Sequence, residues 1–96
     1  MYTIVQVEPF AIWLQHLRDR RTRARLVKRL RRATLGNLGD VKYVGHGVWE
    51  MREHFGPGWR MYYTERSGTL IFLLCGGDKS RQEADIVRAC ELAKEV

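Results

Sequence analysis

The chain contains few of the residues that build disulfide frameworks, metal sites or membrane segments. Its 96 residues include only two cysteines, Cys75 and Cys90, and three widely spaced histidines. A zinc site needs more ligands at closer spacing, so we expect neither a bound metal nor another cofactor. With no signal peptide, free thiols in a reducing cytoplasm are expected. No apolar run approaches the roughly 20 residues of a membrane-spanning helix, so no membrane contact is expected.

Acidic side chains are almost missing from residues 18–32, which hold nine Lys or Arg and one Asp. This segment has a net charge of +8 and the whole chain +6, so the remainder sums to −2. Nine cations cannot be neutralised by one anion, and a basic chain favours a polyanionic partner. We therefore expect salt-dependent binding to RNA phosphates, with a solvated, ion-paired face as the alternative. The RNA-binding candidates in this segment are Arg21, Arg25, Lys28, Arg29 and Arg32.

The first third of the sequence predicts a strand followed by two helices. Thr3–Val7 is short and β-branched, and Pro9 suits the first turn of a helix. Asp19 is a predicted N-cap of the second helix, and Gly36 is placed to end it. Each helix has one apolar stripe, made of Phe10, Trp13, Leu14 and Leu17 in the first and of Leu26, Val27, Leu30 and Ala33 in the second.

The rest of the sequence predicts three strands and a last helix. Residues 36–47 hold four glycines and are interpreted as a loop. Strands are predicted at Val48–Glu53, Trp59–Glu65 and Thr69–Cys75, the last apolar on both faces and therefore interior. Arg81–Lys94 is a predicted helix with a buried stripe of Ile86, Val87, Cys90 and Ala93. The order β-α-α-β-β-β-α predicts one α+β domain over residues 1–96, with helices packed on a small, mostly antiparallel sheet.

The three predicted strands of this second part each bring a cation to a similar place. Arg52 lies on the first strand, Arg60 on the second, and Lys79 follows the third. If Arg52 pairs directly with Arg60, Glu50 falls opposite Tyr62, and a single bulge would break this register. The connecting loop is then residues 54–58. Because like charges facing each other destabilise a sheet, the cluster predicts an anionic ligand, and a nucleic-acid phosphate fits a basic chain best.

A series of short motifs runs along essentially the whole chain. They are Trp13-Leu14 with Leu17 and Asp19, Gly36-Asn37-Leu38-Gly39-Asp40-Val41-Lys42, Gly47-Val48-Trp49-Glu50-Met51-Arg52, Gly56-Pro57-Gly58-Trp59-Arg60-Met61-Tyr62-Tyr63, and Leu74-Cys75-Gly76-Gly77-Asp78-Lys79-Ser80-Arg81-Gln82 with Asp85-Ile86 and Ala89. Each motif is weak alone, but their order and spacing are specific. Together they resemble the RelE/ParE superfamily of type II toxins, in particular its HigB-like branch, often labelled "addiction module killer protein".

The resemblance implies a toxin that is neutralised by a co-expressed antitoxin, here a helix-turn-helix protein. RelE and HigB relatives are ribosome-dependent endoribonucleases, mRNA interferases that inhibit translation by cutting mRNA in the ribosomal A site. ParE relatives instead poison DNA gyrase without cutting RNA. A third interpretation is a nucleic-acid-binding subunit of a toxin–antitoxin repressor complex. Fold alone does not choose among these functions.

RNA cleavage of this kind uses the ribose 2′-OH as nucleophile, and needs a base, an acid and cations around the phosphate. The resemblance implies that Arg60 is the catalytic sheet arginine, that Arg52 is a basic strand residue and that Lys79 is the basic residue after the last strand, with Arg81 close by. The alternatives are an Arg60–Glu50 ion pair, a merely solvated Arg52, and a Lys79 that only precedes a helix. Trp59 either belongs to the core or stacks on an RNA base.

One departure from the family concerns proton transfer. RelE relatives carry a tyrosine, and HigB relatives often a histidine, on the last helix, whereas the corresponding neighbourhood here is Asp85-Ile86. Glu50 or His54 is a candidate substitute, since a histidine side chain can take up or release a proton near neutrality. Asp85 is interpreted as a capping residue or as a partner of an arginine, and Asp78 or Ser80 as a helix N-cap.

Overall fold

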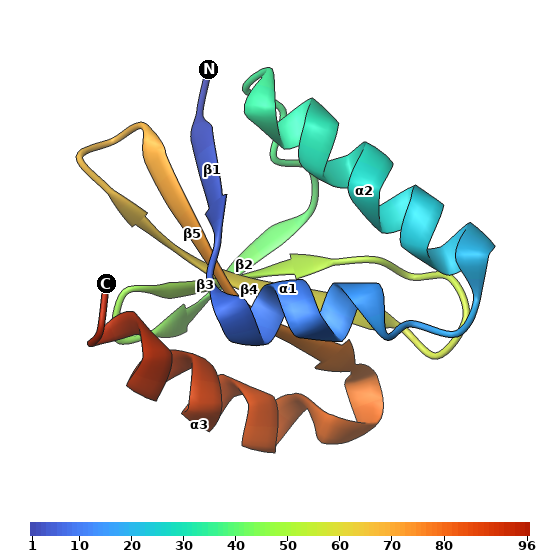
Figure 1. The fold of residues 1–96 in the computed structure, drawn as a ribbon. Helices are drawn as coiled ribbons and strands as arrows, with labels where there is room; N and C mark the ends of the chain where they lie inside the picture. The colour runs from blue at the N-terminus through green and yellow to red at the C-terminus, as the bar shows by residue number, and fades with distance from the viewer.

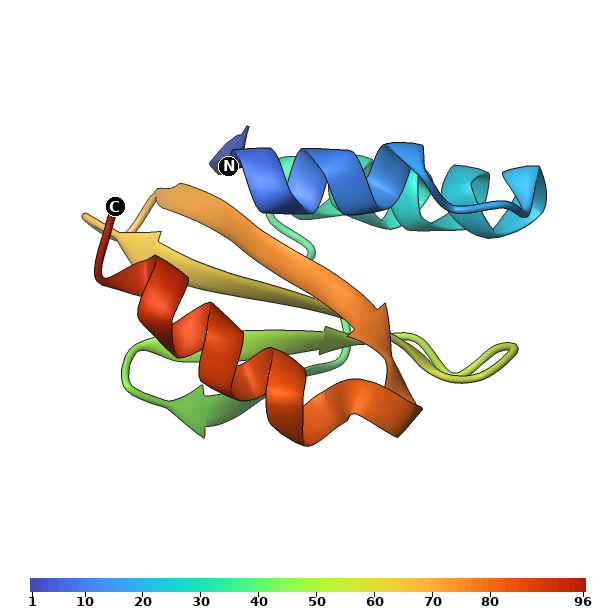
Figure 2. The ribbon, with the colours of Figure 1, turned by 60° about the horizontal axis from the view of Figure 1, so that its bottom comes forward.

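A five-stranded sheet lies between two layers of helices in the computed structural model, which describes residues 1–96 (Figure 1). The strands are β1 (Thr3–Gln6), β2 (Val41–Gly45), β3 (Val48–Arg52), β4 (Trp59–Arg66) and β5 (Leu70–Asp78). The helices are α1 (Glu8–Gln15), α2 (Arg20–Thr34) and α3 (Gln82–Ala93), and a 3-10 turn, η1 (Lys79–Arg81), precedes α3. Figure 2 shows α1 and α2 on one side of the sheet and α3 on the other. The predicted α+β class is confirmed.

The sheet has the strand order β1-β5-β4-β3-β2. β1 pairs with β5 in parallel, and the other neighbours are antiparallel. β5 therefore lies inside the sheet, as its apolar sequence predicts, but β1 pairs with it only as far as Leu73. Beyond that residue, the edge of β5 is not covered by a strand. This open edge faces the ends of α1 and α3.

The predicted start of α1 and both predicted ends of α2 are confirmed, whereas α1 ends at Gln15 and leaves Leu17 of the predicted stripe outside the helix. Pro9 lies in the first turn of α1. The Asp19 carboxylate caps α2, accepting hydrogen bonds from the Arg21 backbone N–H and the Thr22 hydroxyl, both at 3.0 Å. Gly36, with φ +103°, ends α2 in a Schellman turn, in which the Asn37 N–H donates to the Arg32 carbonyl at 3.0 Å.

The interpretation of residues 36–47 as a loop is wrong in part, because Val41–Gly45 forms the edge strand β2. A two-residue turn at His46 and Gly47, both with positive φ, joins β2 to β3. Two of the four glycines that indicated a loop, Gly45 and Gly47, thus belong to a tight hairpin. The pairing of β2 with β3 is irregular between Tyr43 and Gly45, which removes the regular alternation that would have predicted a strand.

The apolar core has two parts, one on each face of the sheet. The larger part fills the space under α1 and α2 and includes Phe10, Leu14, Leu26, Leu30, Met51, Met61 and Ile71. The smaller part lies under α3 and comprises Val48, Tyr62, Leu74, Cys75, Ala89 and Ala93. Both cysteines are free thiols, as predicted, and burial raises the pKa of Cys75 to about 12. No helix is long and apolar enough to cross a bilayer.

The predicted buried stripe of the last helix needs a correction at Val87, whose side chain is 65% exposed. The fully buried positions of α3 are Asp85, Ala89 and Ala93, which are spaced by four residues. Two alanines let the helix approach the sheet closely, while Ile86 and Cys90 are only half-buried at its flank. A large apolar residue therefore faces solvent, and a carboxylate faces the sheet.

Candidate functional site

The pairing of β3 with β4 places four predicted site residues on one face of the sheet. Arg52 lies directly opposite Arg60 and Glu50 opposite Tyr62, with no bulge between the two strands. A hydrogen bond from the Glu53 N–H to the Trp59 carbonyl, at 2.9 Å, closes the loop of residues 54–58. The predicted register is therefore confirmed, and the shared face is the one covered by α3.

The Arg60 side chain is held in place from several directions and is only 6% exposed. Its Nη1 donates to the carbonyls of Glu53 and Trp59, both at 3.1 Å, and its Nε lies 3.7 Å from Glu50 Oε1. The ion pair with Glu50 thus exists. The remaining Nη2 forms no hydrogen bond and is the part of the guanidinium left for a ligand.

Lys79 follows β5 directly and packs beside Arg60 across Gly58. A Cβ at Gly58 would lie 3.3 Å from Lys79 Cβ and 3.6 Å from Arg60 Nη1. Gly58 also has φ +82°, a conformation that side-chain-bearing residues rarely adopt. The Gly-Pro-Gly turn therefore brings two of the three predicted cations side by side.

Arg52 is instead turned toward Asp40, in the segment that leads into β2. Its Nη2 donates to Asp40 Oδ1 at 3.0 Å, and His54 Nε2 lies 2.7 Å from Asp40 Oδ2. The hydrogen bond with His54, followed by that from Arg52, lowers the pKa of Asp40 from 3.8 to about 2. Asp40 was not predicted as a site residue, and its only sequence signal is its place in the motif that contains Gly39-Asp40.

Glu50 is fully buried beneath α3. Its Oε2 accepts a hydrogen bond from Gln82 Nε2 at 2.8 Å, and its Oε1 faces Arg60. The structure does not bring the Glu50 carboxylate to the surface with the other candidates. In this arrangement its effect is to position the Arg60 guanidinium.

Four buried polar atoms gather between the sheet and the start of α3 without a hydrogen-bond partner in the protein. They are Glu50 Oε1, Arg60 Nε, Tyr62 OH and Asp85 Oδ2. Desolvation and then the nearby charges of Glu50 and Asp85 raise the pKa of Tyr62. Burial likewise raises the pKa of Asp85. Sequence reasoning missed this cluster because the burial of these groups depends on α3 closing over the sheet.

Asp85 itself is 5% exposed and forms no side-chain hydrogen bond. Its Oδ1 lies 3.9 Å from Arg81 Nε, which confirms the predicted pairing with an arginine as a long contact. Its Oδ2 lies over Gly77, where a Cβ would come within 2.0 Å. The Gly76-Gly77 pair in a strand was the sequence signal of this close approach. Asp78 caps the 3-10 turn η1 and accepts a hydrogen bond from the Ser80 N–H at 2.8 Å.

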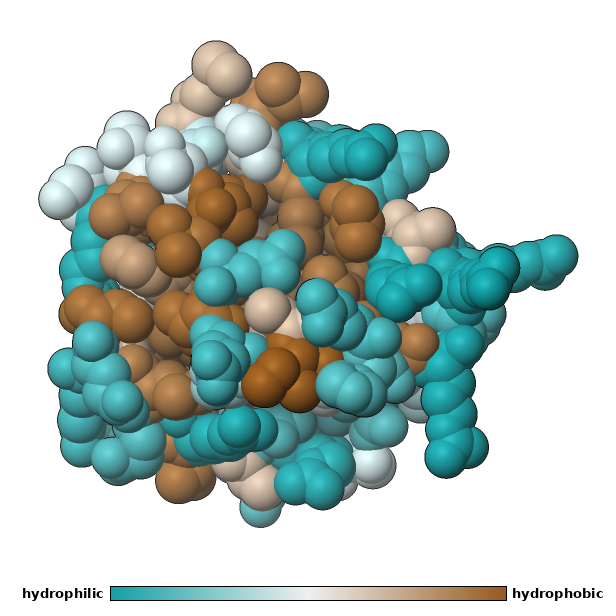
Figure 3. All heavy atoms as spheres, viewed as in Figure 1, coloured by the Kyte–Doolittle hydropathy of each residue, from teal (hydrophilic) through white to brown (hydrophobic).

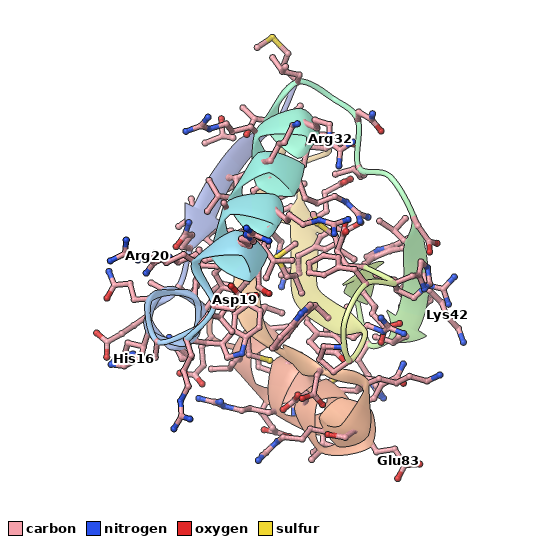
Figure 4. The ribbon with its side chains drawn as sticks, turned by 90° about the vertical axis from the view of Figure 1, so that its right-hand side faces the viewer. His16, Asp19, Arg20, Arg32, Lys42 and Glu83 are labelled. Carbon is pink, nitrogen blue, oxygen red and sulfur yellow. The ribbon has the colours of Figure 1, made fainter.

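The basic helix α2 runs along the side of the molecule, with Arg20 and Arg32 near its two ends (Figure 4). Figure 3 shows hydrophilic side chains projecting where α2 begins, at the right of the view. Four of the predicted RNA-binding cations are exposed: Arg21, Arg25, Lys28 and Arg32. The Arg25 guanidinium also lies 3.8 Å from the centre of the Phe55 ring.

Arg29 does not belong to this exposed surface, which corrects its assignment to the RNA-binding set. Its side chain is buried and forms an ion pair with Glu53. Its guanidinium also donates to the carbonyls of Leu38, Asp40 and Arg52, at 2.8 to 3.2 Å. All of its donors are therefore used within the protein.

Trp59 packs against the α1/α2 core, with its ring centre 6.1 Å from that of Trp13 and tilted by 59°. Trp49 packs against the same core and contacts Tyr43 edge-on at 5.0 Å. The Trp13 and Trp59 rings remain partly exposed at the open end of β5. No group of three or more His, Cys, Asp or Glu side chains is arranged to hold a metal ion.

Comparison with known proteins links the whole site to a family. The sequence model of the family described as "Phage derived protein Gp49-like (DUF891)" matches residues 13–95. The chain is also 44% identical to an uncharacterized protein of Haemophilus influenzae over 87 residues, which cover 91% of this chain and 88% of that protein. The matched region contains every site residue described above.

Proposed function

Because the chain belongs to the Gp49-like phage-derived family, a RelE/ParE-like addiction module killer family, we propose that this toxin acts as a HigB-like mRNA interferase. Its substrate is mRNA bound to the ribosome, and its partner is a cognate antitoxin. The single observation that carries the proposal is the pairing of Arg60 and Lys79 across Gly58. The Lys79 side chain starts beside the Arg60 guanidinium, whose Nη2 is not used by Glu50 or by the backbone, so an anion can be bound by both cations.

A phosphate has room beside Lys79. A hollow of about 510 Å³ lies at the start of α3 and is lined by residues 79–84, including Lys79 and Arg81. The N-terminus of a helix favours anions because its first backbone N–H groups are unpaired. Lys79, Arg81 and the free Nη2 of Arg60 then stabilise the charge that develops on the phosphate in the transition state.

Proton transfer is assigned to His54. Asp40 engages its Nε2, which leaves Nδ1 to accept the proton of the ribose 2′-OH. The 2′ oxygen then forms a bond to phosphorus while the bond to the 5′ oxygen breaks. The products are a 2′,3′-cyclic phosphate and a 5′-OH, whose proton comes from Lys79. Arg52 keeps Asp40 ionised and in place, and the Asp40–His54 pair substitutes for the missing tyrosine or histidine of α3.

The test is cell-free translation followed by primer extension on the mRNA. We expect ribosome-dependent cuts by the wild-type protein, and a loss of at least about 100-fold in His54→Gln and Lys79→Ala, the usual size of general acid–base effects. Lys42→Ala is the matched control, because Lys42 is an exposed lysine on the edge strand β2 (Figure 4). Absence of ribosome-dependent cuts, or full cutting by both variants, would overturn the proposal.

A second candidate function is inhibition of DNA gyrase. It is favoured by one observation, the presence of a buried aspartate on α3 where endoribonuclease relatives carry a tyrosine or histidine. A supercoiling assay at protein concentrations that stop translation separates the two functions. Gyrase inhibition that survives His54→Gln would favour this second candidate.

A further inference from the structure

A pocket of about 340 Å³ opens at the uncovered edge of β5, between the ends of α1 and α3. Its volume falls within the roughly 300–1,000 Å³ of small-molecule sites. Trp13 and Trp59 line it from the α1 side, and Arg81, Asp85 and Arg88 line it from α3. Arg81 also lines the hollow proposed for the phosphate, so the two spaces adjoin.

The floor of this pocket is built from glycine. A Cβ at Gly76 would lie 2.4 Å from the Trp13 ring, and a Cβ at Gly77 would lie 2.0 Å from Asp85 Oδ2. Both wall residues therefore rest directly on the β5 backbone. Glycines within a strand mark a place where another group approaches the backbone closely, and here both Trp13 and Asp85 do so.

Asp85 is the unexplained group of the pocket. Its side chain is only 7% exposed, yet no protein donor forms a hydrogen bond to the carboxylate. Buried carboxylates are normally hydrogen-bonded, and an unsatisfied one destabilises the folded state. The nearest cation, Arg81, is 3.9 Å away and its side chain is largely exposed. An N–H donor supplied by a ligand would satisfy this acceptor.

The other walls favour a flat ligand with acceptor atoms. Indole rings stack on the flat faces of nucleobases. Arginine guanidinium groups donate to the O6 and N7 atoms of guanine, its commonest specific contact in nucleic acids. A carboxylate suits the opposite side of the same base, where N1–H and the N2 amino group are adjacent donors. Adenine and cytosine place a ring nitrogen acceptor beside their amino group, which a carboxylate repels.

We propose that this pocket binds a guanine base, with Asp85 accepting from its N1–H and N2 amino groups, Arg81 or Arg88 donating to its O6 and N7, and Trp13 or Trp59 stacking on its ring. The inference rests on the proposed function for its setting, because the adjoining phosphate hollow would then belong to the same RNA strand. The site therefore selects a guanine next to the phosphate that is cleaved.

The binding test uses mononucleotides and does not depend on catalysis. The indole N–H signals of Trp13, Trp49 and Trp59 are followed by NMR during titration with 5′-GMP, 5′-AMP, 5′-CMP and 5′-UMP. We expect GMP to shift the Trp13 and Trp59 signals, with Trp49 as the unmoved internal reference, and to bind roughly 10-fold more tightly than the others. Asp85→Asn should weaken GMP binding by a similar factor, whereas Glu91→Gln, an exposed acid on the same helix, should not.

Equal shifts with all four nucleotides, no shift with GMP at millimolar concentration, or unchanged GMP binding by Asp85→Asn would overturn the pocket. If Asp85→Asn does not give a folded spectrum, the double variant Arg81→Gln/Arg88→Gln replaces it. A several-fold weaker GMP affinity is then expected, and an unchanged affinity would contradict the proposal. The proposed function fails separately. GMP binding without ribosome-dependent cuts would support the guanine site and contradict the proposed interferase activity. Ribosome-dependent cuts whose base preference is unchanged by Asp85→Asn would contradict the guanine site alone.

Discussion

The charged side chains of this protein differ mainly in whether other residues supply them with hydrogen-bond or ion-pair partners. Asp40 accepts from Arg52 and sits 2.7 Å from His54, so its negative charge is well stabilised. Asp85 has no donor and is held in a buried position by the packing of α3. The first arrangement orients a neighbouring histidine, and the second leaves an acceptor ready for a ligand at a cost in stability.

The lowered pKa of Asp40 predicts how the stability of the protein depends on pH. Its folded-state pKa of about 2 is below the ordinary value of 3.8, so its stabilising effect is complete above pH 3.8 and is lost as the pH falls toward 2. We expect Asp40→Asn to unfold at lower urea concentration than the wild type above pH 4. The gap between the two midpoints should close between about pH 4 and pH 2.

Urea titrations from pH 2 to pH 6 measure this difference. Glu91→Gln is the control, because Glu91 is an exposed carboxylate whose one ion pair is with the exposed Lys94. Wild-type and Asp40→Asn midpoints that stay a constant distance apart over the whole range would contradict the prediction.

At the scale of elements, α2 is fastened to the sheet by a side chain as well as by its apolar stripe. Arg29 reaches from the middle of α2 to the segment before β2 and to the end of β3. It satisfies three backbone carbonyls and the Glu53 carboxylate at once. Because Asp40 and Arg52 lie on the segments that Arg29 joins, α2 also supports the geometry around His54.

Removing this connection should be strongly destabilising. We expect Arg29→Met to lower the free energy of unfolding by about 3–5 kcal/mol, because it leaves the largely buried Glu53 carboxylate and three backbone carbonyls without their partner. Arg29→Lys should not restore it, since one ammonium cannot reach the carbonyls that the planar guanidinium spans. Chemical denaturation measures the effect, and Arg32→Met on the exposed face should change stability by less than about 0.5 kcal/mol. Equal effects of the two methionine variants would show that Arg29 is not the fastening residue.

At the scale of the whole molecule, the charge is divided between two surfaces. The proposed catalytic cations meet at one end of the sheet, whereas the exposed cations of α2 form a separate face on its opposite helical layer. The chain as a whole is at +6, and the excess comes from residues 18–32. Under the proposed function, α2 would bind rRNA while the site engages mRNA.

This separation of the two surfaces predicts that the affinity for ribosomes can be changed without changing the cleavage reaction. We expect the double variant Arg21→Ala/Lys28→Ala to reduce the slope of log affinity for ribosomes against log salt by about 1.5, since each phosphate contact contributes roughly 0.7–0.9. Cleavage at saturating protein should be unchanged. Binding measurements at several salt concentrations test this, and Lys42→Ala should leave the slope as it is. An unchanged slope in the double variant would exclude α2 as the RNA-binding surface.

The amino-acid sequence by itself determined the local features of this protein. Apolar periodicity, the Asp19 cap and the Gly36 terminator set the helices, and strict alternation with a short loop set the pairing of Arg52 with Arg60. These features depend on residues close together in the sequence, so they can be predicted from the sequence alone. The exception is β2, which was not predicted because its irregular pairing with β3 removes the regular alternation of a strand.

Only the tertiary structure decided which charged groups are enclosed and what they contact. Arg29 and Arg60 carry the same charge as Lys28 and Arg52, yet the fold buries the first two and leaves the others in contact with solvent. Asp40 reaches residues 12 and 14 positions away, and Asp85 lies against a glycine of β5 because α3 folds back over the sheet. Burial and long-range pairing arise from the packing of whole elements, which the spacing of residues along the chain does not specify.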